Sequence, residues 1–251
     1  MRRQSPPRAR RPGGERLDRV WRGRRAWGTL RCVDQPTRIF LPGFAACAAM
    51  YARGLPPGWR AAQPPPPKQT QGSLAVLAGW ALREISIQPG RTVLAGHSMG
   101  AALAILVAAA APRQVESLLL IAPAGLPLTK PVRRSARDLL LQLAWRTHRL
   151  ADVATSAEEL VRAPRAATRL VRSLRRLDLT EQMRLIRARG TRVTVVACST
   201  DTLVTPAQCH AASRLLGADY RQLDLDGGHV WMFRNPDVLA TVLDEETAVG
   251  R

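Results

Sequence analysis

The sequence predicts an α/β fold in which helices cover both faces of a mostly parallel sheet. Short runs of β-branched and apolar residues alternate with longer stretches of helical periodicity, and glycines and prolines separate the two kinds of segment. Strands that alternate with helices form parallel sheets that are buried on both faces. The chain has 251 residues and 46% hydrophobic content, enough for one sizeable core, so we expect a single folded unit.

The predicted strands are short apolar runs that end at turn-forming residues. They cover Thr37–Leu41, Gly58–Ala62, Arg91–Ala95, Val115–Ile121, Arg192–Cys198 and Tyr220–Leu225.

The predicted helices occupy the segments between these strands, and some carry recognisable start and stop signals. Ser73 is a typical N-cap for a helix that Pro89-Gly90 ends, and Pro206 fits the first turn of another. The polyproline run Pro64–Pro67 is expected to break any regular element. The remaining helices are expected at Ala45–Tyr51, Ala101–Ala111 and Asp237–Glu246.

The pattern changes between residues 126 and 190, where amphipathic helical segments follow one another without a strand signal. These segments lie around Asp138–Leu150, Ala157–Leu177 and Thr180–Arg189. We therefore expect a helical insertion at 126–190 between the two parts of the core, 32–125 and 191–251.

The net charge of +19 is concentrated outside the expected core. Residues 1–31 hold eleven arginines against two acids, and residues 127–190 hold fifteen basic residues against six acids. The rest of the chain is nearly balanced, with twelve basic residues and eleven acids. This distribution does not favour nucleic acid as a partner.

The first 31 residues are expected to form a basic, disordered tail. They lack the apolar stretch that a secretory signal needs, and no run of the chain is apolar enough to span a bilayer. Four cysteines occur without zinc-ligand spacing, which indicates reduced thiols. We expect a cytoplasmic protein.

The insertion arginines have two interpretations. Arg169, Arg172, Arg175 and Arg176 recur at helical spacing, which places most of them on one face. A solvated face is the simpler interpretation, and a docking surface for an anion is the alternative.

The strongest chemical motif is GHSMG at residues 96–100, which matches GxSxG between a predicted strand and a predicted helix. A serine in such a strained turn needs small neighbours two residues away on either side, and Gly96 and Gly100 meet that need. Ser98 is therefore the candidate nucleophile.

A serine nucleophile requires a histidine base. The chain has four histidines. His97 is fixed beside the nucleophile, and His148 and His210 lie within predicted helices. His229 follows the last predicted strand in a glycine-rich loop, so it is the candidate base.

The candidate acid is Asp201, which follows the strand Arg192–Cys198 at the sheet edge where Ser98 also lies. Asp224 and Asp226 are rivals by their proximity to His229 in sequence. They fall on or beside the last predicted strand, where side chains are expected to face solvent.

Taken together, these motifs resemble the alpha/beta-hydrolase superfamily over roughly Thr37 to Glu246. The chain order of nucleophile, acid and histidine agrees, residues 199–206 (STDTLVTP) resemble the acid loop of that superfamily, and Gly228-His229 resembles its histidine loop. The resemblance implies an alpha/beta-hydrolase fold, with residues 126–190 as a helical cap that shapes acyl-group selection.

The backbone amide of Met99 is expected to form one half of an oxyanion hole. The resemblance assigns the other half to Phe44. The sequence departs from the family at this loop, where Pro42-Gly43 replaces the usual His-Gly. It departs again at Pro64–Pro67, which stands in place of the usual Asp-x-Pro-Gly region.

The predicted function is hydrolysis of a carboxylic ester or thioester through an acyl-serine intermediate, without cofactor or metal. The substrate is expected to be a small acyl ester or thioester, including carrier-protein-linked or CoA-linked ones. A serine rather than an aspartate at residue 98 argues against dehalogenase and epoxide-hydrolase chemistry. Acyl transfer on the same triad is one alternative, and a non-catalytic binding protein with an arginine-rich surface is the other.

Overall fold

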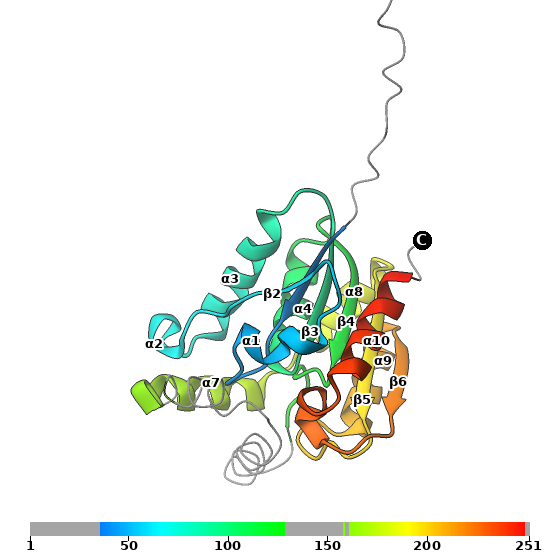
Figure 1. Cartoon of the computed structure of the whole chain (residues 1–251). Coiled ribbons are helices and arrows are strands. Elements are labelled where there is room, and N and C mark those ends of the chain that lie inside the picture. The colour runs from blue at the N-terminus through cyan, green and yellow to red at the C-terminus, as the bar shows by residue number, and fades with distance from the viewer. Residues whose placement is uncertain (1–35, 129–157, 159–160, 249–251) are drawn as a thin grey trace, which may run out of the picture. The chain divides into compact units, whose positions relative to one another are not determined.

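A computed structural model describes residues 36–128, 158 and 161–248 of the chain, and these residues contain a six-stranded, fully parallel sheet (Figure 1). The strand order is β2-β1-β3-β4-β5-β6. The strands are β1 (Thr37–Leu41), β2 (Trp59–Ala61), β3 (Thr92–His97), β4 (Val115–Ile121), β5 (Arg192–Cys198) and β6 (Asp219–Leu223).

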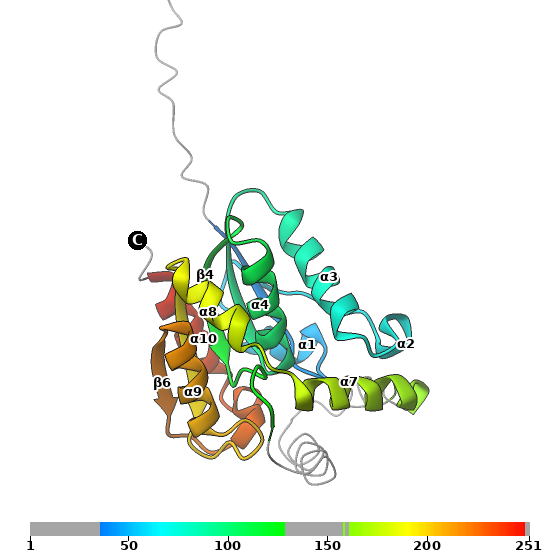
Figure 2. The same ribbon diagram turned by 180° about the vertical axis from the view of Figure 1, so that it is seen from behind.

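Helices cover both faces of the sheet, as the alternation of segments predicts. One face is covered by α3 (Leu74–Ser86), α4 (Met99–Ala110), α8 (Thr180–Ala188) and α9 (Pro206–Leu216) (Figure 2). The other face carries α1 (Ala48–Tyr51), the 3-10 turns η1 (Ala52–Gly54) and η2 (Gly228–Phe233), and α10 (Pro236–Ala248). None of the described helices is long and apolar enough to cross a bilayer.

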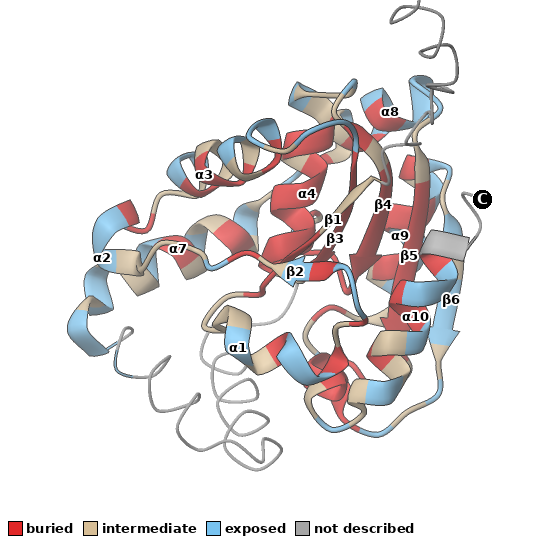
Figure 3. Ribbon diagram, turned by 45° about the horizontal axis from the view of Figure 1, so that its top comes forward, coloured by how far each residue is buried: buried red, intermediate tan, exposed pale blue. Residues whose placement is uncertain are grey.

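The central strands are mostly buried (Figure 3), and their side chains divide between two apolar layers. Ile39 and Leu41 of β1 point into the layer under α4, whereas Phe40 points into the layer under α10. The same alternation holds for Leu118 and Leu119 of β4, as the two-residue period of a strand requires.

Most predicted boundaries agree with the structure, and the exceptions have local causes. α4 begins at Met99, two residues earlier than expected, because the turn at Ser98 leads directly into it. The last residue of the polyproline run, Pro67, starts the short helix α2 (Pro67–Thr70), which is allowed because proline fits the first helical turn. The helix expected around Asp138–Leu150 lies outside the described residues.

Two helices of the insertion have their full extent within the described residues, and their surroundings differ. α8 packs against α4 and α9, and its Met183 and Ile186 are fully buried in the layer over the sheet. α7 (Pro164–Arg176) lies instead against α2 and α3. The proposed cap is therefore represented in the described residues by α7.

Helix α9 is fixed at the start, next to the loop that carries Asp201. The Thr205 hydroxyl accepts a hydrogen bond from the Gln208 amide at 3.3 Å, and the Gln208 side chain accepts one from the Thr205 amide at 3.1 Å. This capping box satisfies two of the amide donors that a helix start leaves without partners.

Replacing Thr205 by alanine is expected to lower the free energy of unfolding by about 1 kcal/mol, because the cap hydrogen bond is lost. Urea unfolding followed by circular dichroism measures this change. Thr202→Ala, at an exposed residue of the same loop, is the matched control and is expected to change little. Equal unfolding midpoints for the two variants would contradict the capping role.

Candidate active site

Ser98 occupies a strained turn between the end of β3 and the start of α4. Its backbone angles are φ 54° and ψ −112°, a region that residues other than glycine rarely adopt. The Ser98 amide donates to the Ile121 carbonyl at 2.9 Å, and its carbonyl accepts from the amides of Ala102 and Ala124 at 3.1 and 3.2 Å. These bonds to neighbouring elements hold the strained conformation in place.

The two glycines of the motif are required by close backbone packing. A Cβ atom added to Gly96 would lie 2.5 Å from the carbonyl carbon of Gly100. One added to Gly100 would lie 1.9 Å from the carbonyl oxygen of Leu41 on the neighbouring strand β1. Any side chain at either position would therefore force the backbone around Ser98 to move.

The structure brings His229 and Asp201 together, although 28 residues separate them along the chain. His229 Nδ1 lies 2.8 Å from Asp201 Oδ2, and both side chains are almost fully buried. Asp201 Oδ1 accepts hydrogen bonds from the amides of Leu203 at 2.8 Å and Val204 at 3.0 Å. The carboxylate is thus held by its own loop and directs one oxygen at the imidazole.

The other candidates for acid and base lie elsewhere. Asp224 is exposed and accepts a hydrogen bond from the Ser199 hydroxyl at 2.8 Å, and Asp226 is also exposed. His210 is exposed on α9, where its ring packs edge-on against Tyr220. His148 lies outside the described residues.

A buried hydrogen-bond chain connects the loop after β1 with the loop that carries His229. The Gly43 amide donates to the Tyr51 hydroxyl at 3.1 Å, and that hydroxyl lies 2.8 Å from His97 Nδ1. His97 Nε2 in turn lies 2.9 Å from the carbonyl oxygen of His229. The rings of His97 and His229 also pack together, with centroids 4.7 Å apart, so the His229 imidazole lies beside the residue that precedes Ser98.

The direction of these hydrogen bonds follows from the carbonyl group of His229 at one end of the series. A carbonyl can only accept, so Nε2 of His97 donates, and Nδ1 of the neutral ring then accepts from the Tyr51 hydroxyl. Burial and the neighbouring His229 lower the pKa of His97 well below its ordinary range, and burial raises the pKa of Tyr51. The chain of hydrogen bonds therefore carries no net charge near neutral pH.

Phe44 and Met99, the candidate oxyanion residues, line the same cavity. This cavity, which we call the Phe44 cavity, has a volume of about 300 Å³ and a mostly apolar wall that includes Leu77, Leu170 and the polyproline run Pro64–Pro67. Within the described part of the chain, neither the Phe44 nor the Met99 amide has a hydrogen-bond acceptor. Neither amide is therefore used by the fold in that part of the structure.

The pairing of Tyr51 with His97 is not predicted by the sequence. No periodicity marks Tyr51 as polar and buried, and the motif alone indicates only that His97 adjoins the candidate nucleophile. The one usable signal is Pro42-Gly43, because a loop that lacks the usual histidine needs support from another side chain. Gly43 must also lack a side chain, since a Cβ there would lie 2.8 Å from His97 Nδ1.

Replacing Tyr51 by phenylalanine is expected to lower the free energy of unfolding by about 2 to 4 kcal/mol. The ring contacts with Phe40 and Phe233 can persist, but the Gly43 amide and His97 Nδ1 lose their buried partner. Urea unfolding measures the loss. Tyr220→Phe is the control, because the Tyr220 hydroxyl is more exposed. If Tyr51→Phe lowers the free energy of unfolding no more than this control does, Tyr51 does not support Gly43 and His97 as proposed.

Comparisons with known proteins agree with this architecture. A profile described as "Alpha/beta hydrolase family" matches residues 21–242. No curated protein sequence matches the chain.

Solved structures share the fold at low sequence identity. A membrane phospholipase A described as a bacterial virulence factor is 20% identical, with 86% of this chain and 79% of that chain covered and a TM-score of 0.68. A putative lipase from Acinetobacter baumannii AYE is 15% identical, with 86% of each chain covered and a TM-score of 0.65. An enol-lactonase from Burkholderia xenovorans LB400 is 19% identical, with 84% and 92% covered and a TM-score of 0.62.

The match of the family profile over most of the chain agrees with the parallel sheet, the helices on both faces and the strained serine turn. The chain therefore belongs to the alpha/beta hydrolase family.

Proposed function

We propose that this protein is a serine hydrolase that cleaves a carboxylic ester or thioester through an acyl-serine intermediate. The observation that carries the proposal is the buried 2.8 Å contact between His229 Nδ1 and Asp201 Oδ2 next to the strained turn at Ser98. An orienting acid that fixes the tautomer of a histidine beside a serine is the arrangement that activates a serine hydroxyl.

The proposed reaction begins with proton transfer from the Ser98 hydroxyl to Nε2 of His229. Because Nδ1 donates its proton to Asp201, the lone pair of the neutral ring lies on Nε2. The serine oxygen bonds to the acyl carbon, and the amides of Met99 and Phe44 stabilise the oxyanion that forms. His229 then protonates the leaving alcohol or thiol, and the carbon bond to that group breaks.

Water completes the cycle by attacking the acyl-serine, with His229 as base in this second step. The proton taken from water passes to the Ser98 oxygen, which leaves as the hydroxyl, and the acid product is released. Both candidate oxyanion residues line the Phe44 cavity, so it is the proposed site for the acyl group. Its volume is at the lower end of the range for ligand pockets, which supports a short acyl group.

The solved structures described as a phospholipase A and a putative lipase share this fold, and their descriptions support a carboxylic ester as substrate.

Replacing Ser98 by alanine is expected to lower the turnover of p-nitrophenyl butyrate by about 10⁴-fold or more, because no oxygen remains to attack the ester. Ester turnover is measured with unfolding followed in parallel. Labelling by a fluorophosphonate probe is expected in the wild type and absent in the variant. Ser199→Ala is the control at a half-buried serine near the same sheet edge. Undiminished turnover in a folded Ser98→Ala protein would end the proposal.

Replacing Asp201 by asparagine is expected to lower kcat by about three to four orders of magnitude with little change in KM. The side-chain oxygen can still accept from the Leu203 and Val204 amides, but the amide group facing His229 favours the wrong tautomer of the imidazole. Steady-state kinetics of p-nitrophenyl butyrate give both constants. A rise in KM alone would assign Asp201 to substrate binding.

A further inference from the structure

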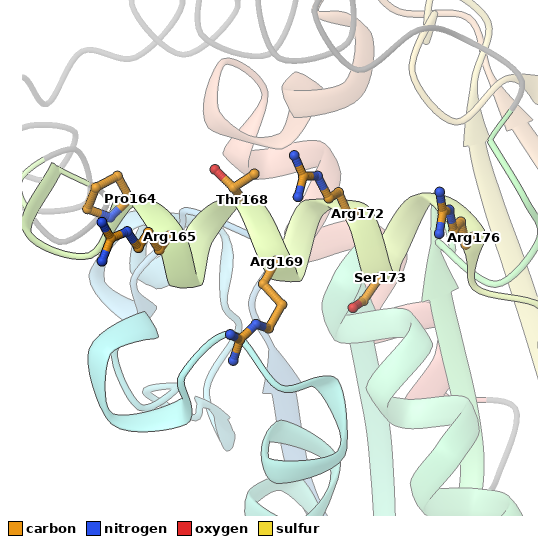
Figure 4. A pocket seen from close by; sticks show the side chains of 7 residues that line it. All are labelled: Pro164, Arg165, Thr168, Arg169, Arg172, Ser173 and Arg176. Atoms are coloured by element: carbon orange, nitrogen blue, oxygen red, sulfur yellow. The ribbon is translucent and has the colours of Figure 1, made fainter.

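Helix α7 has two chemically distinct faces. Leu170 and Leu174 are buried and anchor the helix to the rest of the fold. The exposed side carries Arg165, Arg169, Arg172 and Arg176, which follow one another at three- and four-residue intervals (Figure 4). Arg175, which sequence spacing groups with them, is partly buried and does not belong to this face.

The four exposed arginines line one open groove of about 590 Å³, together with Thr168 and Ser173. We call it the α7 arginine groove. Every charged residue in its described wall is a cation, and the two hydroxyl residues add further hydrogen-bonding groups. Such a lining attracts an anion that can accept several hydrogen bonds.

Three of these arginines have no partner among the residues that the structure describes. Arg162, just before the groove, forms an ion pair with Glu158, and Arg169 donates to the Gln71 carbonyl at 3.1 Å. Within the described residues, Arg165, Arg172 and Arg176 form no ion pair and no side-chain hydrogen bond. Their guanidinium groups are therefore available to an external anion.

The groove and the Phe44 cavity share helix α7. Leu170 forms part of the cavity wall, while its sequence neighbour Arg169 lines the groove. An α-helix with its side chains is about 10–12 Å across, so the two sites are separated by roughly the width of one helix. One elongated molecule can reach both.

We propose that the α7 arginine groove binds the phosphate of a substrate whose leaving group is phosphorylated. The acyl part of such a substrate would occupy the Phe44 cavity. Guanidinium groups suit this role because they present paired N–H donors that match the oxygens of a phosphate. The assignment of the acyl part rests on the proposed hydrolase function, whereas phosphate binding in the groove does not.

Two sources of this chemistry are compatible with the groove: a coenzyme A thioester and a short-chain phosphatidic acid. Each has a matched partner without phosphate. Butyryl-CoA is compared with butyryl-pantetheine, and dibutyryl phosphatidic acid is compared with dibutyrylglycerol. The ratio of kcat/KM within each pair isolates the contribution of the phosphate from that of the acyl group.

The test variant replaces the three arginines without partners, as Arg165→Gln, Arg172→Gln and Arg176→Gln in one protein. We expect the wild type to prefer the phosphorylated member of at least one pair by about tenfold, the combined effect of a few solvent-exposed charge pairs with its phosphate groups. The preference should disappear in the variant through a higher KM for the phosphorylated substrate, with both constants for its phosphate-free partner unchanged. In the wild type, the phosphate preference should also weaken with added salt.

A charge-matched control separates the groove from the overall positive field, which includes the basic tail. It replaces three exposed arginines outside the α7 groove, as Arg83→Gln, Arg113→Gln and Arg214→Gln. This variant has the same net charge as the test variant and is expected to keep the phosphate preference.

Binding is measured independently of turnover by calorimetric titration of coenzyme A and of dibutyryl phosphatidic acid into the full-length Ser98→Ala protein. Binding of either ligand that depends on the three groove arginines supports the groove, even if the proposed hydrolase function fails. The inference is overturned if neither ligand binds, or if the wild type shows no preference within either pair. The inference is also overturned if the test and control variants lose the phosphate preference equally. If the preference occurs in just one of the two pairs, that pair identifies the source of the phosphate.

Discussion

The close packing of the turn at Ser98 against strand β1 is the constraint on which the rest of the site depends. Gly100 approaches the Leu41 carbonyl so closely that no side chain fits between them, and the strained Ser98 backbone is held by bonds to β4 and α4. Strain of this kind persists only where surrounding structure fixes it. The buried sheet and α4 provide that rigidity, so the position of the serine is set by the core and not by a flexible loop.

The hydrogen-bond chain through Tyr51 and His97 extends this rigidity to the loops on either side. It links the Gly43 amide to the carbonyl of His229, and the Asp201 loop is tied to the histidine loop through Thr200, whose hydroxyl donates to the Leu225 carbonyl and accepts from the Gly228 amide. Three loops from distant parts of the sequence therefore share one network. The loop at Pro42-Gly43, which lacks the histidine typical of the family, is supported by two side chains that come from other elements.

The sequence was sufficient to predict the fold because strand and helix signals are local. The buried strands β1, β4 and β5 have the predicted boundaries, and α9 begins at Pro206, the proline expected in its first helical turn. The pairing of His229 with Asp201 could be predicted because both residues follow strands of a parallel sheet, whose carboxyl ends meet at one edge. The Tyr51–His97 contact could not, because it depends on the packing of side chains 46 residues apart. The separation of α7 from α8 also required the structure, since both helices have amphipathic sequences.

The parallel pairing of β4 with β5 leaves residues 122–191 as one long connection between two neighbouring strands. Closing such a loop costs entropy that grows only with the logarithm of its length, and doubling the length adds about 0.6 kcal/mol. Evolution can therefore change the length of this connection at little cost to folding, provided that the buried contacts of α7 and α8 are kept. New substrate preferences can arise in this way while the sheet and its serine turn stay the same.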